Sequence, residues 1–138
     1  MVLVDSSVWI EGLRRTGKLE VKLAIQALME EYEAVWCSII KLEVLGGIRR
    51  EERPRLGHYF RVITYRIVTE ATWDLAKNYS WRLRDRGHNI PTSDILIAAV
   101  AIEAGIRVYA VDQHFIPMEE VLGLRLYRPG YGGLFAAE

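Results

Sequence analysis

Three aspartates of the chain lie where a carboxylate is difficult to explain as an ordinary surface group. Asp5 and Asp112 each follow a short apolar run, VLV and IRVYAV, and Asp94 opens the strongly apolar segment DILIAAVAIEA. Runs of this kind are typical of buried strands and helices. Because the carboxyl ends of parallel strands form the ligand-binding edge of α/β sheets, we expect Asp5 and Asp112 to lie at that edge.

A fourth acid, Glu43, lies within an apolar helical segment, on the face shared with Ile39. A buried, unpaired carboxylate costs several kcal/mol, so such groups either become protonated or bind a cation. Neither Lys nor Arg is adjacent in sequence to Asp5, Asp94 or Asp112. If the four carboxylates converge, they call for a divalent metal, and all-oxygen ligation selects Mg²⁺ or Mn²⁺ rather than Zn²⁺.

Metal ions of this type commonly act on phosphate esters, because they lower the pKa of a bound water and neutralise charge on the phosphoryl group. Ser7, two residues after Asp5, could hydrogen-bond a water on the metal or another carboxylate. Each residue also has a purely structural explanation: a first-turn acid at Asp94, a turn at Asp112, a helix cap at Ser6 or Ser7. The combination, rather than any single residue, favours metal-dependent chemistry.

The apolar pattern predicts strands that alternate with helices, which indicates an α/β fold in three layers. In such βαβ units the central sheet is mostly parallel and helices cover both of its faces. We expect strands at 2–4, 34–37, 65–68 and 106–111, helices at about 6–15, 19–33, 39–49, 70–86 and 94–104, and a helical turn near 118–122 that precedes the segment LRLY at 124–127. The helices at 39–49 and 94–104 are apolar on most sides, which predicts burial.

The composition places the chain among ordinary globular proteins. It has 138 residues, of which 51% are hydrophobic, and this length fits a single domain, 1–138, with a surface arm at about 129–138. We expect no membrane span, because no run approaches the roughly 20 apolar residues needed. The start of the chain lacks a basic leader, which predicts a cytoplasmic protein. Cys37 is the only cysteine, so disulfides and Cys-rich zinc sites are excluded.

The charges balance, with 18 Lys+Arg against 18 Asp+Glu, whereas simple nucleic-acid binders usually carry a basic excess. The arginines are nevertheless clustered. The first cluster, which precedes the segment of Asp94, consists of Arg82, Arg84 and Arg86. The second cluster consists of Arg49, Arg50, Arg53 and Arg55, and two glutamates within it reduce its positive charge. The first cluster is the better candidate for binding nucleic-acid phosphates, although a solvated face explains it equally well. His114, two residues after Asp112, could also touch the site.

Four sequence blocks together resemble the motifs of PIN-domain nucleases, and most closely those of VapC toxins. They are VDSSVWIEG at 4–12, KLEVLGG at 41–47, PTSDILIAAVA at 91–101 and VYAVDQHF at 108–115. The resemblance covers nearly the whole chain, but segment 50–90 matches only in general character. It implies a PIN-like fold, with the four family acids at Asp5, Glu43, Asp94 and Asp112 and the family hydroxyl at Ser7.

The same resemblance implies a Mg²⁺- or Mn²⁺-dependent endoribonuclease, usually a homodimer, that is silenced by a VapB-type antitoxin covering the acidic pocket. Two other classes remain open. A catalytically silent PIN fold would serve only as a binding module. A phospho-accepting receiver domain also gathers acids at strand ends, but it begins with paired acids and carries a suitably placed Lys. Here Ser6 and Ser7 follow Asp5, and neither Lys41 nor Lys77 is suitably placed.

Overall fold

The computed structural model describes residues 1–130 and contains a four-stranded sheet with the strand order β3-β2-β1-β4. The strands are β1 (Val2–Val4), β2 (Ala34–Cys37), β3 (Thr64–Arg66) and β4 (Arg107–Tyr109). Every pairing is parallel, with Leu3 of β1 opposite Val35 and Val108. The expected parallel sheet is therefore confirmed, and the carboxyl ends of all four strands lie at one edge.

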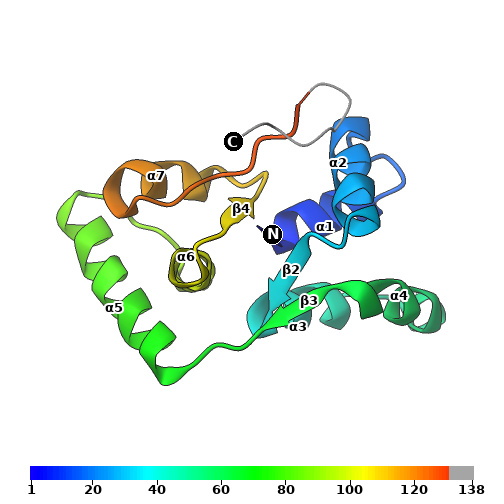
Figure 1. Cartoon of the computed structure of the whole chain (residues 1–138), viewed down its shortest axis with the longest axis horizontal. Helices are drawn as coiled ribbons and strands as arrows, with labels where there is room; N and C mark the ends of the chain where they lie inside the picture. Colours follow the sequence, from blue (N-terminus) through cyan, green and yellow to red (C-terminus); the bar gives the residue numbers. More distant parts are fainter. Residues whose placement is uncertain (131–138) are drawn as a thin grey trace.

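Helices cover both faces of this sheet, as expected for a three-layer α/β fold. Helices α1 and α2 lie on one side, and α5, α6 and α7 lie on the other (Figure 1). The helices are α1 (Ser6–Leu13), α2 (Leu19–Glu30), α3 (Ser38–Gly46), α4 (Arg53–Tyr59), α5 (Glu70–Asp85), α6 (Thr92–Ala104) and α7 (Ile116–Leu122), with short 3-10 turns at η1 (Arg50–Glu52), η2 (Phe60–Val62) and η3 (Gln113–Phe115). No helix among residues 1–130 is long and apolar enough to cross a membrane.

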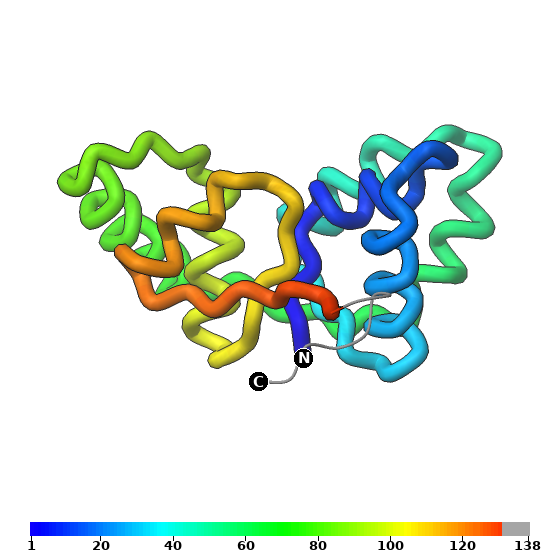
Figure 2. The backbone as a smooth tube through the Cα atoms, turned by 90° about the horizontal axis from the view of Figure 1, so that it is seen from above, coloured from blue at the N-terminus to red at the C-terminus, as the bar shows by residue number. Residues whose placement is uncertain are grey.

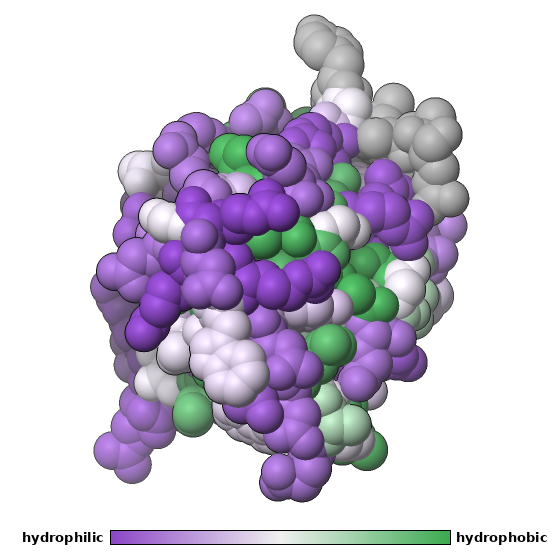
Figure 3. Space-filling model, turned by 90° about the vertical axis from the view of Figure 1, so that its left-hand side faces the viewer, coloured by the Kyte–Doolittle hydropathy of each residue, from purple (hydrophilic) through white to green (hydrophobic). Residues whose placement is uncertain are grey.

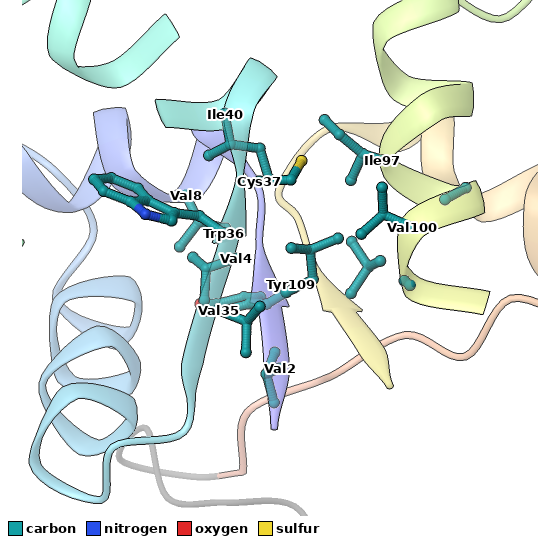
Figure 4. Packing of buried hydrophobic residues seen from close by; sticks show 14 of the residues in the cluster. Val2, Val4, Val8, Val35, Trp36, Cys37, Ile40, Ile97, Val100 and Tyr109 are labelled. Atoms are coloured by element: carbon teal, nitrogen blue, oxygen red, sulfur yellow. The ribbon is translucent and has the colours of Figure 1, made fainter. Parts of the chain in front are cut away.

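The core extends over both faces of the sheet, and on the side of α6 the burial predicted from sequence is confirmed. All seven residues from 95 to 101 are buried, and Ile97 and Val100 face the sheet near Cys37 and Tyr109 (Figure 4). On the opposite side, Trp9 is 1% exposed, and its indole Nε1 donates to the carbonyl of Val4 at 3.1 Å. This packing fixes the junction between β1 and α1.

The second apolar helix, α3, does not match its prediction. It ends at Gly46 rather than near residue 49, and only Ile40 and Val44 are buried. Leu42 is 72% exposed. The expectation of burial is therefore wrong for the face of α3 that carries Leu42, because an apolar residue on the surface gives the same sequence pattern as one in the core.

Two further segments differ from the sequence prediction. Helix α4 lies inside the Arg-rich stretch and is anchored by the buried Leu56. Strand β3 lies at 64–66, and all three of its residues are exposed. The segment 124–127 forms a single parallel bridge, between Leu126 and Val108. The predicted arm at about 129–138 falls, from residue 131 onward, outside the described residues.

Candidate active site

Asp5 occupies the junction between β1 and α1 and is 3% exposed. It is the N-cap of α1, and its Oδ2 accepts hydrogen bonds from the Ser7 backbone N at 3.1 Å and from Ser7 Oγ at 2.5 Å. Its other oxygen, Oδ1, is buried and has no hydrogen-bond partner among the described residues. The pKa of Asp5 is raised to about 6, chiefly because the carboxyl is buried; the hydrogen bonds from Ser7 lower it, and the charges of Asp94 and Glu43 add to the rise.

The two serines after Asp5 connect it to other elements. Ser7 Oγ accepts from the backbone N of Val111 at 3.3 Å, which joins the end of β1 to the segment after β4. Ser6 Oγ donates to Glu43 Oε2 at 3.1 Å and so orients a carboxylate of α3. Ser7 therefore lies beside Asp5 as the sequence predicted, and Ser6 serves a different acid.

Asp94 lies in the first turn of α6, and its side chain is 13% exposed. Burial raises the pKa of this carboxyl, the charges of Asp112 and Glu43 act in the same direction, and the hydrogen bond with His114 opposes them. Asp112 caps the turn after β4, where its Oδ1 accepts from the backbone N of His114 at 2.9 Å. The two aspartates thus approach each other from the two sides of His114.

His114 is the contact that sequence reasoning left undecided. Its Nδ1 lies 3.0 Å from Asp94 Oδ2 and 3.0 Å from Asp112 Oδ1. The signal in the sequence was its place two residues after Asp112, because a 3-10 turn brings such a side chain back toward its cap. Among residues 1–130, it is the one basic side chain that pairs with any of the four acids.

The structure brings all four predicted acids together at one edge of the sheet. The negative charges of Asp94 and Glu43 raise the pKa of Asp5, and those of Asp112 and Glu43 raise the pKa of Asp94. In Figure 2, the ends of β1 and β4 and the start of α6 lie along the upper edge of the molecule. Glu43 itself is an exposed residue of α3 that reaches the cluster through Ser6.

The donor set fits a hard divalent cation. The four acids supply carboxylate oxygens, and Asp5 Oδ1 is buried without a partner among the described residues. Asp94, Asp112 and His114 each offer one ligand atom, and these three atoms lie within 4.8 Å of one another. Clustered negative charge with so little positive compensation favours a bound divalent cation.

The arginines predicted to bind RNA lie outside this cluster. Arg82, Arg84 and Arg86 are exposed at the end of α5 and just beyond it, and Arg82 stacks on the ring of Tyr79 at 5.6 Å. Helix α5 packs against α6 and α7, and its side of the molecule is largely hydrophilic with scattered apolar patches (Figure 3). The structure shows no contact between these arginines and the four acids among residues 1–130.

The four tryptophans divide into a buried pair and an exposed pair. Trp9 and Trp36 are buried and stack edge-on with ring centroids 6.2 Å apart. Trp73 and Trp81 are 53% and 59% exposed on α5, where the Lys77 ammonium lies over the Trp81 ring at 5.2 Å. The second pair therefore belongs to the surface of this chain.

Comparison with known proteins agrees with the resemblance found in the sequence. The chain is 26% identical over 119 residues to Ribonuclease VapC19 of Mycobacterium tuberculosis, which covers 86% of this chain and 94% of that protein. FitAcB from Neisseria gonorrhoeae has a similar structure, with a TM-score of 0.76, 18% identity and coverage of 93% and 97%. A toxin-antitoxin complex from Klebsiella pneumoniae gives a TM-score of 0.67, with 17% identity and coverage of 83% and 90%.

The match to a family model includes the sheet and the candidate active site. Residues 2–120 match the PIN domain, a segment that runs from β1 into α7 and includes all four acids. The parallel sheet and its flanking helices are likewise those of the similar solved structures. The chain therefore belongs to the PIN domain family.

Proposed function

We propose that this protein is a metal-dependent endoribonuclease of the VapC type, the toxin of a toxin–antitoxin pair, and that it hydrolyses RNA phosphodiester bonds. The observation that carries the proposal is the convergence of four carboxylates around Asp5, whose buried Oδ1 has no partner among residues 1–130. The similarity to a protein named as a ribonuclease supports RNA as the substrate.

Asp5, Glu43, Asp94 and Asp112 would hold Mg²⁺ or Mn²⁺. When bound, such an ion lowers the pKa of water and neutralises charge on the phosphoryl group. Ser7 occupies Asp5 Oδ2 with two hydrogen bonds and so leaves Oδ1 for the ion. Burial and the neighbouring carboxylates raise the pKa of Asp5 and of Asp94 in the metal-free chain, and a bound dication would oppose this rise by stabilising the ionised carboxylates.

Cleavage of a generic RNA with Mg²⁺, with Mn²⁺ and with EDTA tests this proposal. We expect the metal to be required and Asp5→Asn to lower the rate at least about 100-fold, because several kcal/mol of charge stabilisation is lost. Asp74→Asn, on the exposed face of α5, is the matched control and should retain full activity. Full activity of Asp5→Asn, or metal-independent cleavage that follows the protein through purification, would contradict the proposal. Metal and RNA binding without cleavage would instead favour a silent binding module.

We assign the RNA backbone to Arg82, Arg84 and Arg86, because they are exposed at the end of α5 and just beyond it, in the stretch of chain that leads to α6 and Asp94. Replacing all three by Ala should weaken RNA binding and reduce its salt dependence, by up to about 0.7 in the log–log slope per lost phosphate contact. The matched control replaces Arg49, Arg50 and Arg53, three exposed arginines around η1. An unchanged salt slope in the first variant would exclude this surface.

The proposed partners are a VapB-type antitoxin and a second copy of the chain. The antitoxin is supported by the likeness to a solved toxin-antitoxin complex. The homodimer is supported by the exposed apolar residues Leu42, Tyr65 and Ile67 near α3 and β3, which are 72%, 46% and 74% exposed. Leu42→Asp should then give a monomer in size-exclusion chromatography, whereas Leu19→Asp on α2, which is 68% exposed, should not. A dimeric Leu42→Asp variant would place the interface elsewhere.

A further inference from the structure

We propose that His114 is itself a ligand of the metal site, and that its nitrogen makes the site prefer transition-metal dications such as Mn²⁺ and Co²⁺ over Mg²⁺. The inference rests on the proposed function, because it concerns the same site. Its basis is the position of the imidazole, whose Nδ1 lies 3.0 Å from a carboxylate oxygen of Asp94 and 3.0 Å from one of Asp112.

These spacings match those of neighbouring ligands around one ion. In octahedral coordination with ligands at about 2.1 Å, adjacent ligand atoms lie about 3.0 Å apart. The nitrogen and the two oxygens also lie within 4.8 Å of one another as a set. The buried Oδ1 of Asp5, without a partner among the described residues, is an independent sign that a cation belongs at this edge.

The backbone fixes where the His114 ring can go. Its N–H donates to Asp112 Oδ1 at 2.9 Å, and the next residue, Phe115, is 1% exposed and anchors η3 in the core. The imidazole itself is 47% exposed. The Cα of His114 is therefore held beside both aspartates, while the ring retains the freedom to adjust to an ion.

The chemistry of the donor changes the expected metal preference. Carboxylate oxygens suit Mg²⁺ and Mn²⁺ alike, whereas imidazole is a ligand of transition metals. One nitrogen among the oxygens therefore strengthens the binding of Co²⁺ and, to a smaller degree, of Mn²⁺, which stands lowest in the order of transition-metal affinities. It adds little for Mg²⁺, which keeps much of its water shell.

A purely structural role for His114 makes a different prediction. If the ring only held Asp94 and Asp112 in place by hydrogen bonds, its loss would weaken all divalent ions to the same extent. Glutamine at this position would then restore binding, because its amide can also hydrogen-bond carboxylates. A ligand role predicts that glutamine retains Mg²⁺ binding but does not restore the preference for transition metals.

Metal binding to the full chain without RNA separates these roles. Isothermal titration calorimetry with Mg²⁺, Mn²⁺ and Co²⁺ would compare the wild type with His114→Ala, His114→Gln and the control His58→Ala, an exposed histidine on α4. We expect both His114 variants to bind Co²⁺ at least about tenfold more weakly, the lower limit for even an outer-shell partner. Mn²⁺ should weaken less, Mg²⁺ least, and His58→Ala should bind as the wild type does.

The visible spectrum of the Co²⁺-loaded protein provides a second measurement. Loss of a nitrogen ligand should shift the bands in both His114 variants and leave them unchanged in His58→Ala. Equal weakening of all three ions, or recovery of Co²⁺ affinity in His114→Gln, would overturn the ligand role. A wild type that binds none of the three ions would overturn the proposed function as well. Metal binding with unaltered preference in the His114 variants would overturn this inference alone.

Discussion

Asp5 and Asp112 end two neighbouring parallel strands, yet the structure treats them in opposite ways. Asp5 follows the central strand β1, is 3% exposed, and accepts two hydrogen bonds from Ser7. Asp112 follows β4, the last strand in the sheet order, is 36% exposed at its side chain, and pairs with His114. The Asp5 side of the site is therefore buried in the core at an energetic cost, whereas the Asp112 side forms a partly exposed rim.

The pH dependence of the free energy of unfolding, measured with EDTA present, is the strongest test of this difference between Asp5 and Asp112. Asp5 has a pKa of about 6 in the folded chain against 3.8 for the ordinary group, so the folded state binds the extra proton between these values. Its contribution to the free energy of unfolding is therefore most favourable below about pH 4 and falls as the pH rises through 6. The total loss is about 3 kcal/mol.

Asp5→Asn should remove this dependence, because asparagine does not ionise. Relative to the wild type, the variant should gain about 3 kcal/mol between pH 4 and pH 7, measured by urea unfolding at each pH. Asp74→Asn, which changes an exposed aspartate, is the control for the loss of one negative charge. A constant difference between Asp5→Asn and the wild type across this range would mean that Asp5 is solvated in the folded chain.

Ser7→Ala should produce the next largest effect, because it leaves a buried carboxylate with fewer donors. A hydrogen bond to a charged group contributes about 1.5–3 kcal/mol, so we expect a loss near 2 kcal/mol at pH 8 and a smaller loss at pH 4, where Asp5 is protonated. The pKa of Asp5 should rise further. Ser80→Ala on α5, a half-buried serine, should cost less at both pH values. A loss in Ser7→Ala that does not change with pH would separate this serine from the ionisation of Asp5.

Asp112→Asn should have the smallest effect on the metal-free fold. Partly exposed ion pairs such as that of Asp112 with His114 contribute less than about 1 kcal/mol, so the midpoint of thermal unfolding with EDTA should barely change. Addition of Mn²⁺ should stabilise the wild type by mass action and stabilise this variant less. A destabilisation as large as that expected for Ser7→Ala would show that the rim is as rigid as the buried side.

The buried side of the site could be predicted from sequence because local patterns determine it. An acid directly after VLV and an acid opening an all-apolar helix are both unusual, and Asp5 and Asp94 lie where those patterns place them. The four acids also lie at one edge because a parallel sheet requires it. Their roles as metal ligands remain predictions.

The features that sequence analysis missed depend on tertiary context. Helix α4 is hidden in a charged stretch that has Leu56 as its one buried residue. Strand β3 is exposed at all three residues, so no alternation of apolar and polar residues marks it. His114 contacts Asp94, which lies 20 residues away in the sequence, and no local pattern identifies this partner. Leu42 shows the reverse case, in which an apolar residue lies on the surface.

The hydrogen bond from the backbone N of Val111 to Ser7 Oγ spans 104 positions of the chain. Strand β1 therefore lacks one of its two neighbours in the sheet until β4 has been synthesised. Asp112, the fourth carboxylate, follows three residues after the end of β4. Non-local pairing of this kind forms slowly because a long loop must close first. During translation, this edge of the sheet cannot form before Asp112 has been made, so a shorter nascent chain lacks the complete set of four carboxylates.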